Sequence, residues 1–102
     1  MAGNPWQALL AESPEVGRAL QGLVEALAAQ PALSDKVKQL IYIALQAAHR
    51  NSAAVAAHIP MAVKAGATRS EVVEAILLTI PAAGVGGAMH CLPEVAKAFR
   101  GE

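Results

Sequence analysis

Alanine dominates this sequence and is the feature that most constrains its fold. It accounts for 24 of the 102 residues, whereas aromatic residues make up only 3%. Alanine has the strongest intrinsic preference for helix, while strands favour β-branched and aromatic residues. The small alanine side chain also lets neighbouring helices approach closely. The composition therefore predicts an all-α fold of closely packed helices.

Helix-start signals divide the first third of the chain. Asn4–Pro5 predicts a short first helix, and Ser13–Pro14 starts a second that runs to about Gln30, where Pro31 follows. Ser34 is the expected N-cap of a third helix. Apolar residues at helical spacing give the second helix one apolar stripe: Val16, Leu20, Leu23, Val24 and Leu27.

Similar signals divide the middle of the chain. Asn51 is a candidate N-cap for a helix that runs to Ala65, and Gly66 supplies a left-handed cap. Thr68 and Glu71 have the spacing of a capping box, in which each side chain binds the other residue's backbone amide. They start a helix that is apolar nearly all round.

The last third of the chain contains a proline and a glycine-rich run. Pro81 and the segment 84–87 predict a break, after which the last helix is expected to begin near Cys91, with Pro93 in its first turn. We expect about six helices forming a single domain over residues 1–102, with no internal repeat or linker.

Composition also bears on partners and location. Hydrophobic residues make up 55% of the chain, and a domain of this size buries only about 60–70% of its unfolded surface. Apolar surface should therefore stay exposed on one subunit, which predicts a homo-oligomer. Eight basic and eight acidic residues cancel, so we expect no nucleic-acid partner.

No membrane partner is expected either. The most apolar stretch, 75–89, contains Pro81 and three glycines and is shorter than the roughly 20 residues that cross a bilayer. The first 15 residues lack the basic start of a signal peptide. We therefore expect a cytoplasmic protein.

The segment 33–67, LSDKVKQLIYIALQAAHRNSAAVAAHIPMAVKAGA, is followed by Thr68 and an acidic, apolar helix. It resembles the central motif of the carboxymuconolactone decarboxylase and alkylhydroperoxidase D-like family. This resemblance implies a helical bundle that assembles as a homotrimer or homohexamer. It also implies that the family's histidine falls on His58.

The resemblance further implies that the redox residues of the peroxidase branch are missing. Its two cysteine positions hold Asn51 and Ala54, and its relay glutamate is replaced by Gln39. A thiol peroxidase needs an attacking thiolate and a resolving cysteine. The decarboxylase branch, which does without that pair, is therefore the nearer match.

One polar stripe accompanies His58. Four polar residues lie on one face of the third helix by their helical spacing: Gln39, Tyr42, Gln46 and His49. This stripe is either a solvent-facing surface or a pocket wall. We expect His58 as the catalytic acid or base, and Gln39, Tyr42 and Asn51 as ligand-binding residues in a pocket near a subunit interface. The alternative for His58 is a hydrogen-bonded helix residue without a site role.

Metal and thiol chemistry receive less support. His49, His58, His90 and Cys91 lack the spacing of known metal ligands, so we expect no metal and no other cofactor. Cys91 is either a small buried hydrophobic residue or, if a neighbour lowers its pKa, a reactive thiol.

Three functions remain open from the sequence. The first is a decarboxylase-like lyase, or a protein that binds a small organic acid or lactone, using His58. The second is a non-catalytic oligomeric binding or scaffold protein. The third is a peroxide-reactive protein that acts through Cys91.

Overall fold

The computed structural model describes residues 4–100, and this part of the chain contains helices and no strands. The predicted all-α class is therefore confirmed. The helices are α1 (Pro5–Glu12), α2 (Pro14–Ala28), α3 (Asp35–Ala48), α4 (Ser52–Lys64), α5 (Arg69–Leu77), α6 (Ile80–Ala83) and α7 (Val85–Ala98). Six of them have eight residues or more, as expected, and α6 adds one turn of four residues.

The chain divides into two compact units, an N-terminal unit in residues 1–32 and a C-terminal unit in residues 33–102. The N-terminal unit contains α1 and α2, and the C-terminal unit contains α3 to α7. The expectation of a single domain over residues 1–102 stays a prediction.

The N-terminal unit is a helix pair with almost no buried interior. Asn4 caps α1 as predicted, and it forms a full capping box with Gln7. Ser13 precedes α2 without a side-chain cap hydrogen bond. Gly17 is the buried residue of α2. It packs so closely against Leu10 that a Cβ at position 17 would come within 2.7 Å of the leucine side chain. The apolar stripe predicted on α2 is present but exposed along its whole length.

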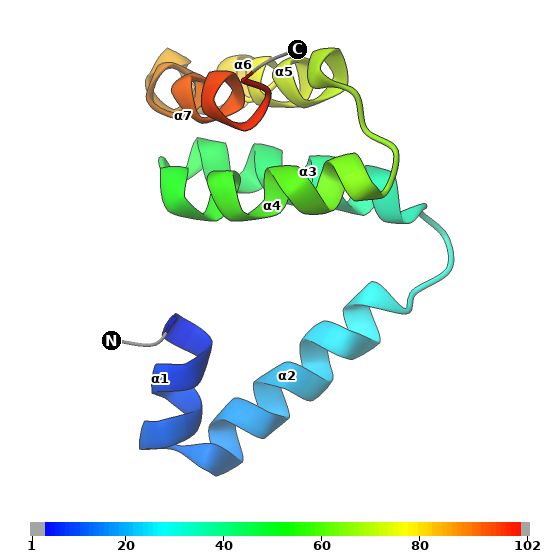
Figure 1. Ribbon diagram of the computed structural model, residues 1–102, viewed down its shortest axis with the longest axis vertical. Coiled ribbons are helices and arrows are strands. Elements are labelled where there is room, and N and C mark those ends of the chain that lie inside the picture. Colours follow the sequence, from blue (N-terminus) through cyan, green and yellow to red (C-terminus); the bar gives the residue numbers. More distant parts are fainter. Residues whose placement is uncertain (1–3, 101–102) are drawn as a thin grey trace. The chain divides into compact units, whose positions relative to one another are not determined.

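The C-terminal unit has a continuous core. Its helices form two layers, α3 beside α4 and α5 to α7 above them (Figure 1). The core contains twelve buried residues: Ile43, Ala47, Val55, Ile59, Ala62, Ala67, Val72, Ile76, Ala88, Cys91, Val95 and Phe99. The predicted caps at Ser34, Asn51 and Thr68 all bind backbone amides. Gly66 has the positive φ of 104° expected of a left-handed cap.

The expected start of the last helix near Cys91 is wrong. α7 begins six residues earlier, at Val85, after Gly84 adopts a φ of 85°. Gly87 lies inside the helix, and only glycine fits there because a Cβ would overlap the carbonyl oxygen of Ala47 on α3. The glycine run therefore contains the predicted break, at Gly84 between α6 and α7, together with a close-packing position at Gly87, whereas Pro93 lies in the helix interior.

Apolar side chains also remain exposed in the C-terminal unit, among them Ile41, Leu45, Leu78, Val85 and Met89. Within residues 4–100, no helix combines the length and the hydropathy that crossing a membrane would require. The predicted apolar surplus on the surface is thus present on both units.

Candidate functional site

His58 lies in the middle of α4 and faces α3, the helix against which α4 packs most extensively. Its Nδ1 atom is 2.9 Å from Oε1 of Gln39, which lies in the first half of α3. Both side chains are half-buried. The structure thus brings together Gln39 and His58, which were both expected in one pocket, and their side chains touch each other directly.

Tyr42 lies one turn beyond Gln39 and packs on the same histidine. The ring centroids of Tyr42 and His58 are 4.1 Å apart, and the ring planes are tilted by 39°. Tyr42 is 38% exposed. Gln39, Tyr42 and His58 therefore form one group at the α3–α4 contact, here called the His58 cluster.

Burial sets the charge of His58. It lowers the pKa of the imidazole below its ordinary value of 6.5, because an imidazolium loses hydration in a half-buried position. Gln39 is neutral and offers no charge that would reverse this effect. His58 is therefore neutral at pH 7, in the form that can accept a proton.

The structure does not bring Asn51 into the His58 cluster. Asn51 is the N-cap of α4, and its Oδ1 accepts a hydrogen bond of 3.0 Å from the amide of Ala54. Seven helical residues separate it from His58, a rise of about 10 Å. Its side chain is committed to capping, and a ligand-binding role for Asn51 stays a prediction.

The remaining stripe residues fit neither sequence interpretation fully. Gln46 is half-buried, and His49, the C-cap of α3, is exposed. The stripe is therefore neither a uniform solvent face nor a closed wall.

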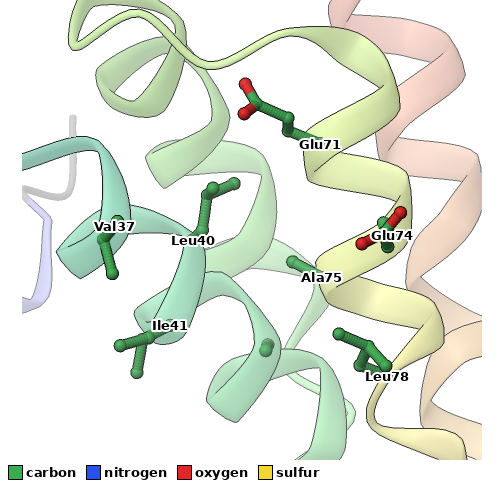
Figure 2. Close-up of a pocket in the computed structure, with 8 residues that line it drawn as sticks. Val37, Leu40, Ile41, Glu71, Glu74, Ala75 and Leu78 are labelled. Atoms are coloured by element: carbon green, nitrogen blue, oxygen red, sulfur yellow. The ribbon is translucent and has the colours of Figure 1, made fainter.

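A hollow of about 320 Å³ lies between α3 and α5, and the side chains that line it are drawn in Figure 2. Val37, Leu40 and Ile41 line one side, and Ala75 and Leu78 face them from the other. Sequence reasoning missed this hollow. Its α3 residues recur at helical spacing with Ala44, a second apolar face that could have indicated it.

Two glutamates stand at the α5 side of this hollow. Glu71 forms an ion pair of 3.0 Å with Lys36, and Glu74 lies one turn further. The pKa of Glu71 is lowered, first by its hydrogen bond from the Thr68 amide and then by the Lys36 ammonium. The carboxylate of Glu71 is thus committed to holding the start of α5 and fastening it to α3.

A second hollow of about 350 Å³ lies between α4 and α7, lined by Ile59, Pro60, Val63, Lys64, Ala98 and Phe99. Neither hollow is lined by a member of the His58 cluster. The pocket expected around His58 is thus neither of these two.

Sequence comparison gives the family. The family model named carboxymuconolactone decarboxylase family matches residues 14–97, from the start of α2 to the last turn of α7. This chain belongs to the carboxymuconolactone decarboxylase family. No curated protein and no solved structure was found to match it. The match includes every residue of the His58 cluster.

This carboxymuconolactone decarboxylase family member has a single cysteine, and its surroundings oppose thiol chemistry. Cys91 is completely buried in the core, and this burial raises the pKa of its thiol. Peroxide reacts with an accessible thiolate. Both properties therefore oppose a peroxide-reactive role.

Across residues 4–100, no three histidine, cysteine, aspartate or glutamate side chains gather closely enough to hold a metal ion. His58 has a glutamine and a tyrosine as its polar neighbours. The His58 cluster is thus suited to hydrogen bonding and proton transfer by its own side chains.

Proposed function

We propose that this protein is a decarboxylase-like enzyme of the lyase class that acts on a small organic acid or lactone, with His58 transferring the proton. The observation that supports this proposal is the 2.9 Å contact between His58 Nδ1 and Gln39 Oε1. It orients a neutral imidazole whose other nitrogen can meet a substrate. Orientation of a catalytic base by a hydrogen bond is a recurring feature of acid–base sites.

The proposed reaction needs one proton and no cysteine. In the loss of CO₂ from a carboxylated lactone, the bond to the carboxylate carbon breaks and its electron pair enters the conjugated enolate. A proton must then be added to a ring carbon. His58 supplies it after picking up a proton from solvent or from the substrate, and returns to the neutral form. Gln39 keeps the ring in place throughout because its amide does not titrate.

The test uses carboxymuconolactone, the compound in the family's name, with CO₂ release as the readout. We expect His58→Ala to lower the rate by about 100-fold or more, the usual contribution of a positioned acid or base. His49→Ala is the matched control, since His49 is an exposed histidine outside the cluster. Wild-type turnover by a folded His58→Ala variant would refute the proposal.

A second candidate is a binding protein without turnover. It is favoured by Gln39, which cannot relay a proton, and by the position of both hollows away from His58. In that case the lactone should raise the melting temperature of the wild type but not of His58→Ala. No CO₂ would be released by either protein.

We also propose that the chain assembles as a homotrimer or homohexamer. The exposed apolar stripe of α2 supports this assembly, because its five large side chains find no cover within the N-terminal unit. Light scattering coupled to size-exclusion chromatography should give a mass of three or six chains. A monomer at micromolar concentration would refute this proposal.

A further inference from the structure

We propose that the apolar stripe of α2 docks into the α3–α5 hollow of a second copy of this chain. The inference rests on the homo-oligomer proposed above and deepens it, because it names the two surfaces that meet. One surface is the α2 stripe, and the other is the hollow of about 320 Å³ whose lining is drawn in Figure 2.

The α2 stripe is a wide apolar face without charge. Helical spacing places the three charged residues of α2, Glu15, Arg18 and Glu25, outside this face. Its five aliphatic side chains are each between 39% and 59% exposed: Val16, Leu20, Leu23, Val24 and Leu27. The face therefore offers large side chains and no group that needs water or an ion-pair partner.

The α3–α5 hollow has a lining that suits such a face. It combines two small residues, Ala44 on α3 and Ala75 on α5, with the larger side chains of Val37, Ile41 and Leu78. These three larger side chains are 36%, 44% and 66% exposed. Helices pack by fitting rows of large side chains into grooves over smaller ones. The hollow can therefore receive a row of leucine and valine side chains.

The rows on the two surfaces have the same spacing. Val37, Ile41 and Leu45 are exposed on α3 at intervals of four residues. Val16, Leu20 and Val24 are exposed on α2 at the same interval. Rows with a four-residue interval on both helices interdigitate in the commonest class of helix packing.

Charged groups leave the middle of the hollow free. The carboxylate of Glu71 is held by the amide of Thr68 and by the ammonium of Lys36. Glu74 is exposed and can keep its water at the α5 edge. An apolar helix that enters the hollow therefore does not have to bury an unpaired charge, which would be costly.

The composition of both surfaces favours a second copy as the occupant. Permanent interfaces between subunits are more hydrophobic than transient ones and resemble a domain core cut in two. Both surfaces here are aliphatic. The stripe and the hollow are also different surfaces, so the contact is heterologous and can close into a ring. In a ring of three copies, every stripe is covered and every hollow is filled.

Two charge variants of the full-length chain test this contact. Leu23→Glu places a carboxylate on the stripe, and Ile41→Glu places one at the hollow. Both replace exposed side chains, so the helical circular-dichroism signal should be kept. In light scattering coupled to size-exclusion chromatography, each variant alone should fall from the wild-type mass to one chain. An equimolar mixture should give two chains, because the intact hollow of one variant accepts the intact stripe of the other.

Met89→Glu is the matched control. Met89 is an exposed apolar residue of α7 outside both surfaces, so this variant should keep the wild-type mass. A folded Ile41→Glu that keeps the wild-type mass would overturn the inference. A mixture of the two variants that remains at one chain would overturn it as well.

These outcomes separate the inference from the proposed assembly. A wild type of three or six chains that Ile41→Glu does not dissociate would refute only the docking of α2 into the hollow. A wild type of two chains that both variants dissociate, and that their mixture restores, would refute only the trimer or hexamer. A monomeric wild type would refute both.

Discussion

The apolar stripe of α2 and the core of the C-terminal unit are similar in sequence and opposite in burial. The stripe residues of α2 are between 39% and 59% exposed. In contrast, Ile43, Val55 and Ile76 in the C-terminal unit are completely buried. The α2 stripe recurs at helical spacing, and so do the buried residues within one core helix, such as Val55, Ile59 and Ala62 on α4. The comparison teaches that periodicity predicts which face of a helix is apolar, but not what covers that face.

The two units therefore depend on different sources of stability. The C-terminal unit supplies its own cover, since residues from α3, α4, α5 and α7 enclose one another. The N-terminal unit has little interior beyond Gly17 under Leu10. Isolated helices of this length are marginal in water. Within this pair of helices the α2 stripe has no cover.

The largest expected effect on stability comes from shortening one apolar side chain in each unit. Ile76→Ala removes a fully buried side chain and should lower the free energy of unfolding by about 3–4 kcal/mol. Leu23→Ala truncates a side chain that is 54% exposed. Its cost should grow with protein concentration if a second copy covers the α2 stripe. Urea unfolding followed by circular dichroism, at two concentrations, measures both.

The same unfolding experiment can contradict the proposed difference between the two units. If Leu23→Ala costs as much as Ile76→Ala at every concentration, the α2 stripe is buried within the single chain. A cost near zero throughout would mean that nothing covers it.

Substitution of two glycines should give the next largest change in stability. Gly87→Ala places a Cβ against the Ala47 carbonyl oxygen, a backbone atom that cannot turn aside, and should destabilise the chain by about 3 kcal/mol. Gly22→Ala in α2 meets nothing within 4 Å and should stabilise it by about 0.5–1 kcal/mol. Thermal unfolding should shift in opposite directions. A tolerated Gly87→Ala would mean that the α3–α7 crossing is looser than described.

Helix caps give a smaller effect. Thr68→Ala removes the side chain that binds the Glu71 amide and should cost about 1 kcal/mol. Ser13→Ala, at the start of α2, should change stability little, because Ser13 makes no side-chain cap bond. Urea midpoints of the two variants give the comparison. Equal losses would show that the Thr68–Glu71 box has no special part in holding α5.

The smallest effect is a pH dependence confined to the C-terminal unit, which contains all three histidines. The pKa of His58 is lower when folded than the 6.5 of the unfolded chain. The unfolded state therefore binds more protons, and stability falls as pH drops from about 6.5 through the folded pKa. His58→Gln should reduce this dependence of unfolding free energy on pH, whereas His49→Gln should leave it unchanged. A slope unchanged in His58→Gln would assign it to another group.

Local signals made much of the fold predictable from the sequence. Four N-cap residues accept hydrogen bonds from amides three residues ahead, so their roles can be inferred from the local sequence alone: Asn4, Ser34, Asn51 and Thr68. Gly66 likewise has the positive φ that its place after a helix predicts. Such caps fix helix boundaries, and helical periodicity supplies the core-facing residues.

Contacts distant in sequence account for the misses. Gly87 lies in the first turn of α7 against the Ala47 carbonyl, forty residues earlier, and no local pattern reports that contact. Asn51 was assigned to the site through the family resemblance, yet its oxygen is taken by the Ala54 amide. The facing of Gln39 and His58 could be foreseen only because both positions belong to the family's motif.

The complete burial of Cys91 has a practical consequence. A maleimide reagent reacts slowly with a thiol that solvent cannot reach, so the native protein should take up almost no label at Cys91. Engineered cysteines on the solvent face of α2 and on α3 could therefore carry paired spin labels or fluorophores with the natural residue left in place. Pulsed resonance or energy-transfer distances from these pairs would then report directly on the geometry of the assembled protein.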